Sequence, residues 1–245
     1  PRLSDAGAAC MESPVASRWL PRFYLEGFAD PDERAAPTLW VYRAPVGQWR
    51  ATRIDGRESA DRDYNEVADP AFARGPDPEE VFSARAADLG ALLREHLPAR
   101  RAVAAADRAL LASFFAFLGV RRSPRSGSME EIEARHGQES LARVLAEMGW
   151  VFFEAREPDF FVTSSSPLLV SFPVQEQDFI GTLDVQTPTS EVTLPLSRRL
   201  ALLGTWKRRG ELWRTAPEEA LLELNFRTCT RALRFLASPR PAVPG

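Results

Sequence analysis

Apolar residues recur every three or four positions through the middle of the chain, which is the spacing of amphipathic helices. One such run covers residues 77–97, where an Asp-Pro-Glu-Glu start provides a helix N-cap and Pro98 ends the pattern. A second run covers about 102–118. A third opens with Ser128 and Glu131, a capping-box pair, so the sequence predicts three helices in succession.

The end of the second predicted helix is apolar on nearly every side. A helix without a polar face is buried in a core, because no side of it is suited to water. We therefore expect this end to form the centre of a single core shared by both halves of the chain, through Phe114, Phe115, Phe117 and Leu118.

Short β-type runs flank this helical region. Before it, an aromatic segment at residues 19–28 predicts a short helix, and two runs at 39–42 and 48–54 predict a hairpin. After it, strand-type runs lie at residues 150–155, 160–163, 168–172, 191–196 and 200–206. The chain thus changes from a helical to a strand period near residue 150.

A last helix is predicted after the Thr-Ala-Pro-Glu-Glu sequence at residues 215–219, with Leu222, Phe226 and Leu236 among its apolar positions. Because helices and strands are grouped, we expect an α+β fold. Its N-terminal and middle part is helical with a short hairpin, and its C-terminal part has antiparallel strands and a closing helix. No linker divides residues 18–245, which we interpret as a single domain after a flexible lead-in at 1–17.

Composition narrows the class of protein. The 245 residues are 44% hydrophobic and 27% charged, with a net charge of -3. No run of about 18 uncharged apolar residues predicts a membrane span, and no signal-peptide pattern precedes the first aromatic cluster. Only Cys10 and Cys229 are cysteines, so a disulfide framework is not expected. These features favour a cytoplasmic protein without membrane association.

Six segments carry a resemblance to one family, in the same order along the chain. They are Trp19–Asp30, Leu39–Tyr42, Asp61–Tyr64, Arg122–Pro124, Phe161–Pro167 and Leu194–Ser197. Together they resemble the motifs of the bacterial family called domain of unknown function 4238, over roughly residues 17–237. The resemblance implies the fold of that family, whereas the function has to be argued from the site.

The chain departs from the family pattern at its most reactive positions. Arg18 stands where the family has a His, Arg22 and Gly119 where it has a Gln, and Ser165 and Ser166 where it has an Asp-Asn pair. The replaced residue types are those that bind metals or move protons. The resemblance therefore implies a member that is catalytically degenerate.

The sequence predicts no cofactor and no transition-metal site. It has two histidines, His96 and His136, far apart, and no Gly-rich phosphate loop. The serine run Ser164–Ser166 suggests a nucleophile, but a serine needs a general base and neither histidine lies in a matching motif. A polar turn is the favoured interpretation of these serines.

An anion site is the chemistry that the remaining candidates favour. If the resembling segments converge, Arg18, Arg22 and Arg122 bring three positive charges together, beside Tyr64 and the hydroxyls of Ser164, Ser165 and Ser166. Guanidinium groups hold phosphate or carboxylate by charge-assisted hydrogen bonds. These seven residues are the predicted ligand-binding set, and no catalytic residue is predicted.

Charge is also segregated along the chain. Residues 55–95 hold eleven acidic residues and five arginines, whereas 197–240 hold ten basic and four acidic residues. With Trp206 and Trp213 as stacking groups, the basic C-terminal part could contact nucleic acid or another anionic ligand. The alternatives are that the two zones face each other or are solvated, and that the partner is a protein.

Two functional hypotheses follow from these features. The first is an intracellular binding or regulatory protein, catalytically degenerate, that recognises an anionic or macromolecular partner. The second is a metal-independent hydrolase that acts on a phosphate-containing or peptide substrate. Convergence of the predicted ligand-binding residues on one concave pocket would favour the enzyme.

Overall fold

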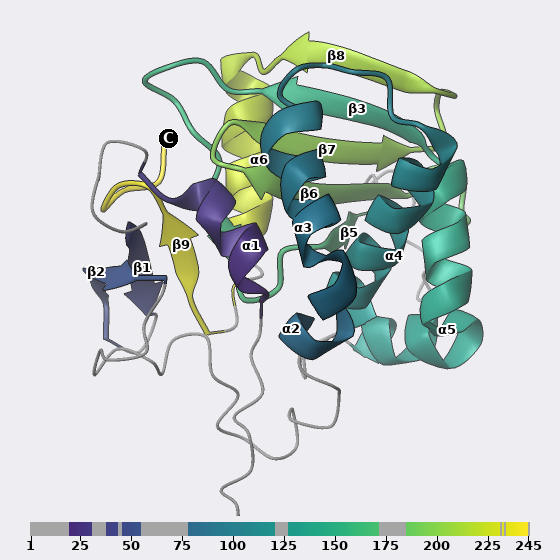
Figure 1. Cartoon of the computed structure of the whole chain (residues 1–245), viewed down its shortest axis with the longest axis horizontal. Coiled ribbons are helices and arrows are strands. Elements are labelled where there is room, and N and C mark those ends of the chain that lie inside the picture. The colour runs from purple at the N-terminus through teal and green to yellow at the C-terminus, as the bar shows by residue number, and fades with distance from the viewer. Residues whose placement is uncertain are drawn as a thin grey trace, which may run out of the picture.

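Two β-sheets lie side by side in the computed structural model of the chain (Figure 1). The larger sheet has the order β5 (Leu169–Ser171), β6 (Glu191–Ser197), β7 (Leu200–Thr205), β3 (Gly149–Glu154) and β8 (Glu211–Thr215). The smaller has the order β2 (Gln48–Arg53), β1 (Thr38–Arg43), β9 (Leu236–Ser238) and β4 (Thr163–Ser164). With the helices described below, these sheets confirm the predicted α+β class.

The structure describes residues 20–30, 38–43, 46–54, 78–120, 127–171, 185–230, 232 and 234–244. The predicted lead-in at 1–17 and three of the predicted ligand-binding residues, Arg18, Tyr64 and Arg122, lie outside these ranges.

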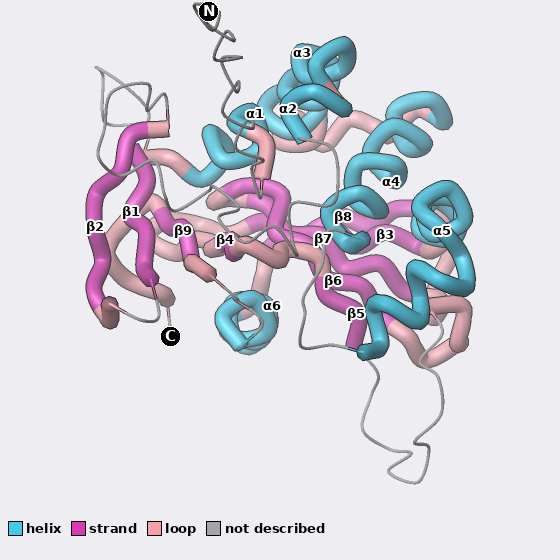
Figure 2. The backbone as a smooth tube through the Cα atoms, turned by 90° about the horizontal axis from the view of Figure 1, so that it is seen from below, coloured by secondary structure: helices cyan, strands magenta, loops and turns pink. Residues whose placement is uncertain are grey.

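Helices cover both faces of the larger sheet (Figure 2). One face packs, through the main core, against helices that come before β3 in the chain: α3 (Ala86–Ala91), α4 (Ala105–Val120) and α5 (Gly127–Glu147). The short helix α2 (Pro78–Val81) precedes α3, and its Val81 is exposed. The opposite face contacts α6 (Glu218–Thr230). Residues of β7 alternate between the two sides, since Leu200 and Leu202 join the main core and Ala201 joins the small cluster under α6.

The apolar end of α4 lies at the centre of the main core, as the sequence predicts. Phe114, Phe115, Phe117 and Leu118 are each at most 4% exposed. The rings of Phe114 and Phe115 contact aromatic side chains from both halves of the chain, Tyr24 and Trp150 among them. The core extends from Leu20 to Ala237 in sequence and joins the two sheets.

The predicted helix at 77–97 is interrupted. It consists of α2, a 3-10 turn (Ser83–Arg85), α3 and a π-helical turn (Leu92–His96). The Ser83 hydroxyl donates to the Glu80 carbonyl at 2.9 Å, a local bond that competes with the helical ladder. Gly90 lowers helix propensity further, and the Arg94 guanidinium occupies the place its side chain would fill.

Two strands are additional to the predicted ones. β8 pairs with β3 in parallel, so the larger sheet is mixed rather than antiparallel throughout. To reach that position, the loop after β7 crosses the start of β3, where a Cβ on Gly149 would lie 2.4 Å from the Arg208 carbonyl oxygen. Glycine is therefore required at this crossing.

The second additional strand, β9, corrects the predicted last helix. α6 ends at Thr230, and Leu236 belongs to β9, where it pairs with Tyr42 of β1 and Ser164 of β4. Leu222 and Phe226 also lie on the solvent side of α6, where they are 36% and 64% exposed. Apolar spacing predicts all three residues in one helix, but the pairing of β9 with β1 and β4 ends that helix before Leu236.

Candidate functional site

Three of the resembling segments meet at one buried tyrosine. Tyr24 of α1 (Arg22–Leu25) is fully buried, and its hydroxyl donates to the Pro195 carbonyl at 2.6 Å. The Thr163 hydroxyl lies 2.9 Å from the Tyr24 hydroxyl oxygen. Burial raises the pKa of Tyr24 far above its ordinary value. The expected convergence of the entry segment with the serine turn and β6 is therefore found at this point.

This meeting point is closed to ligands. The Arg198 amide donates to the Gly27 carbonyl at 2.9 Å, directly beside Tyr24. A Cβ on Gly27 would lie 3.3 Å from the Ser197 Cβ, so the two backbones are in contact. The convergence of these segments consequently stabilises the fold and leaves no space for an anion.

The serine turn is a structural element. Ser164 is 0% exposed and its hydroxyl accepts the Ser166 amide at 3.2 Å, whereas the Ser165 hydroxyl accepts the Arg234 amide at 3.0 Å. The Ser166 hydroxyl is buried and has no hydrogen-bond partner among the described residues. Among the described residues no histidine bonds to these serines, and the polar-turn interpretation fits this geometry.

Arg22 lies on the surface of α1 rather than with the serines. Its guanidinium forms an ion pair with Glu26 at 2.9 Å, and Arg94 holds the same carboxylate at 2.9 Å. Arg94 also donates to the Phe23 carbonyl at 3.2 Å. Among the described residues, no hydrogen bond joins Arg22 to Ser164, Ser165 or Ser166; the other three members of the predicted set lie outside the described ranges.

Several groups of the basic C-terminal zone make contacts within the protein. Glu191 accepts Lys207 at 2.8 Å and lies 3.6 Å from Arg227. Arg199 pairs with Glu157 and donates to two backbone carbonyls. The two predicted stacking groups are also engaged: Trp213 stacks on Phe152 with ring centroids 4.2 Å apart, and the Trp206 indole donates to the Val185 carbonyl at 2.7 Å.

A further arginine, Arg108 of α4, joins four elements. Its guanidinium lies 3.8 Å from the centroid of the Trp150 ring, donates to the Ala146 and Met148 carbonyls, and pairs with Glu211 of β8 at 3.2 Å. Burial lowers the pKa of Arg108, and Glu211 partly offsets this shift. Each of the three guanidinium nitrogens donates a hydrogen bond inside the protein, so Arg108 is a structural group.

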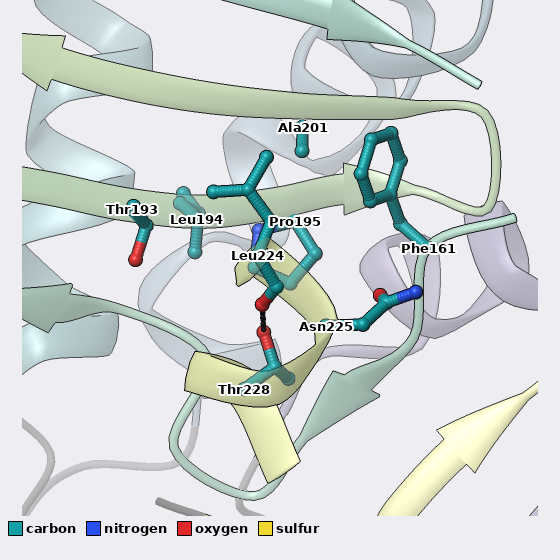
Figure 3. Close-up of a pocket in the computed structure, with 8 residues that line it drawn as sticks. All are labelled: Phe161, Thr193, Leu194, Pro195, Ala201, Leu224, Asn225 and Thr228. Carbon is teal, nitrogen blue, oxygen red and sulfur yellow. Dashed lines mark hydrogen bonds between the residues drawn. The ribbon is translucent and has the colours of Figure 1, made fainter. Parts of the chain in front are cut away.

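One hollow lies between α6 and the larger sheet (Figure 3). It has no room even for a water molecule, and apolar side chains form most of its wall. Asn225 is satisfied there, since its amide oxygen accepts the Val162 amide at 3.1 Å and its nitrogen donates to the Phe160 carbonyl at 3.0 Å. The Thr193 hydroxyl has no partner. A hollow of this size and polarity is a packing imperfection under α6.

A second hollow, on the β1–β2 hairpin, has different chemistry. We call it the hairpin hollow; it offers about 60 Å³ to a bound group, and its described lining consists of Val41, Arg43, Val46, Gln48, Arg50 and Thr52. Val41 and Thr52 are buried at its base, whereas Gln48 and Arg50 are exposed at its rim. The hairpin lies at the outer margin of the molecule in both views (Figures 1 and 2).

The register of the hairpin places these side chains on one face. Val41 pairs with Arg50, and Arg43 pairs with Gln48, so the two arginines are diagonal neighbours on adjacent strands. Diagonal Cβ atoms lie roughly 7–8 Å apart, within reach of long side chains. Both guanidinium groups can therefore contact one bound group at the mouth of the hollow.

The hairpin hollow is electropositive. Among the described residues, neither Arg43 nor Arg50 forms a salt bridge with a carboxylate, in contrast to Arg22, Arg108 and Arg227. Two neighbouring cations without an acid repel each other, and a bound anion removes that repulsion. The amide of Gln48 and the hydroxyl of Thr52 supply neutral donors beside them.

Sequence reasoning predicted the hairpin but missed its chemistry. The signal was present, because residues 38–54 contain three arginines and no aspartate or glutamate in a chain of net charge -3. A charge count over long zones of the chain does not reveal a basic segment as short as this hairpin. Pairing the residues across the turn, as the register does, places two of the arginines on the same face.

Comparisons with known proteins identify no relative. No family model matches the chain, and neither a curated protein nor a solved structure matches it. The resemblance to the domain of unknown function 4238 family therefore stays a prediction. Within the described ranges, His, Cys, Asp and Glu form no group of three or more that could hold a metal ion. The helices in these ranges are too short or too polar to cross a membrane.

Proposed function

We propose that this chain binds an anionic ligand, with a phosphate or carboxylate group seated in the hairpin hollow. One observation carries the proposal: Arg43 and Arg50 lie on the same face of the hairpin, and within the described residues no carboxylate neutralises them. Guanidinium groups in this arrangement hold an oxyanion by charge-assisted, bidentate hydrogen bonds.

The functional class stays that of a binding protein, and the proposed binding residues change. Arg43 and Arg50 replace the sequence-based set as the groups that contact the anion, with Gln48 and Thr52 as additional donors. Hydrolysis at the serine turn has no support from the geometry, because Ser164 and Ser165 are buried and hold backbone amides.

Isothermal titration with inorganic phosphate and pyrophosphate tests this proposal at low salt. Native protein is expected to bind, and affinity should fall as salt rises because the site is partly exposed. Arg50→Gln removes a charged donor worth roughly 1.5–3 kcal/mol and should weaken binding about tenfold or more. Arg214→Gln is the matched control, because Arg214 is also an exposed strand arginine.

Two results would overturn the proposal. The first is the absence of phosphate or pyrophosphate binding by the native chain at low salt. The second is equal loss of affinity in Arg50→Gln and Arg214→Gln, which would show that only overall charge matters.

A further inference from the structure

The face of the hairpin opposite the hollow is aromatic. The register places six residues there: Thr38 pairs with Arg53, Trp40 with Ala51, and Tyr42 with Trp49. We call Trp40, Tyr42, Trp49, Ala51 and Arg53 the aromatic face. The Tyr42 and Trp49 ring centroids are 5.4 Å apart, so these two residues form a cross-strand pair.

The aromatic face takes no part in the main core. β1 contributes Leu39 and Val41 to that core, both from the opposite side of the strand. Trp40, Tyr42 and Trp49 remain partly exposed. Exposed aromatic side chains gathered on one surface mark a contact site more often than a packing site.

Ala51 is the smallest residue of the aromatic face, and we call the position above it the Ala51 slot. It is exposed, with Trp40 directly across the hairpin and Trp49 and Arg53 two residues away on the same side of β2. Because the Ala51 side chain is a single methyl group, a flat ring can approach the backbone there and stack beside the two indoles. Base stacking on aromatic groups and arginine is typical of single-stranded nucleic-acid sites.

The two faces are connected over β2, which is the outer strand of the smaller sheet among the described strands. A flexible polymer can therefore contact the hairpin hollow with its phosphates and the aromatic face with its bases. The polymer has to be single-stranded, because paired bases in a duplex cannot stack on protein side chains. An acidic peptide would satisfy Arg43 and Arg50 but would leave the Ala51 slot empty.

We propose that the hairpin binds single-stranded nucleic acid, with phosphates held by Arg43 and Arg50 and a base stacked above Ala51 between Trp40 and Trp49. This inference rests on the proposed function, since the phosphates use the same hollow. It adds a second recognition surface with its own chemistry, and the two can be separated by substitution.

Fluorescence anisotropy with a labelled single strand of about ten nucleotides, of mixed sequence, measures this binding on the full chain at low salt. Ala51→Leu fills the slot without adding charge or removing an aromatic contact. It should weaken oligonucleotide binding about tenfold and leave phosphate binding unchanged. Ala106→Leu, at an exposed alanine of α4, is the matched control and should bind as the native chain does.

The outcomes separate the inference from the proposed function. Native protein that binds phosphate but not the oligonucleotide, or Ala51→Leu protein that binds the oligonucleotide normally, overturns the inference and leaves the anion site. Equal affinity for polyglutamate or for duplex of the same length also overturns it. Oligonucleotide binding that is weakened by Ala51→Leu but not by Arg50→Gln overturns the proposed phosphate position and retains the stacking slot. A chain that binds neither probe overturns both.

Discussion

Arg108 and the pair Arg43 and Arg50 show two opposite uses of arginine in one molecule. Arg108 has a carboxylate, two carbonyls and an indole ring around it, all from the protein. Arg43 and Arg50 line an open hollow, where the described residues offer them no acid. The difference teaches that the surroundings of an arginine, rather than its position in a basic segment, distinguish a structural group from a ligand-binding one. We therefore expect large effects where interior groups lose their partners, and small effects on stability where a hairpin arginine without a described carboxylate is replaced.

The largest expected effect lies in the interior. Phe115 is 1% exposed and packs against Phe114 and Trp150, so Phe115→Ala leaves a cavity in the main core. Its free energy of unfolding should fall by roughly 3–5 kcal/mol in a chemical denaturation experiment. The native chain should unfold in one transition, because this core joins both sheets. Two separate transitions would show that residues 1–149 and 150–245 unfold independently.

Removing the Arg108 guanidinium should cost nearly as much. Arg108→Met keeps an apolar stem over Trp150 but leaves Glu211 without its cation and two carbonyls without their donor. Losing one member of a largely buried pair should lower the free energy of unfolding by about 3 kcal/mol. Arg214→Met, at an exposed arginine on the same strand as Glu211, is the control and should change it little. Equal effects in the two variants would contradict the structural role of Arg108.

The buried tyrosine predicts a smaller effect that depends on pH. Tyr24→Phe removes the hydroxyl shared with Pro195 and Thr163, and should cost roughly 1–2 kcal/mol near pH 7. Burial raises the folded-state pKa above the ordinary value of 10, so this group's contribution to stability is complete below pH 10 and declines above it. The penalty of the variant should therefore shrink by about 1.4 kcal/mol per pH unit above pH 10. A penalty independent of pH would show that the hydroxyl is accessible to water.

The smallest effect on stability is expected at the hairpin. Arg43→Gln and Arg50→Gln remove charges that have no carboxylate partner among the described residues, so each should change the free energy of unfolding by less than about 0.5 kcal/mol. The double variant should be at least as stable as the native chain in low salt, because like charges no longer repel. A loss of more than about 1 kcal/mol in either single variant would indicate a structural partner for that arginine.

Local patterns were sufficient for most of the fold. The capping signals and apolar spacing predicted α4 and α5, and two β-type runs around a turn predicted the β1–β2 hairpin. β8 and β9 were missed because their five and three residues are defined by pairing with distant strands, and short runs carry little periodic signal. The first predicted helix is interrupted for a local reason, because the Ser83 hydroxyl bonds to the Glu80 carbonyl three residues earlier, and apolar spacing does not reveal such a bond.

The candidate site was less predictable than the fold. The sequence predicted that the entry segment and the serine turn converge. They meet at the buried Tyr24 rather than at an open site, because an apolar core surrounds this tyrosine. Sequence cannot show whether a given arginine finds a carboxylate, since Arg108 and Glu211 are more than a hundred positions apart. The hairpin arginines could have been found by pairing residues across the predicted turn and noting the absence of acids.

The dependence of stability on phosphate concentration tests whether the hairpin hollow holds an anion. Protein that binds phosphate only when folded gains stability with ligand concentration, by about 1.4 kcal/mol for each tenfold increase above the dissociation constant. At constant ionic strength, the free energy of unfolding of the native chain should rise in this way, and that of the Arg43→Gln, Arg50→Gln double variant should stay constant. Parallel curves for the two proteins, or no rise in either, would contradict the assignment of the anion to the hairpin hollow.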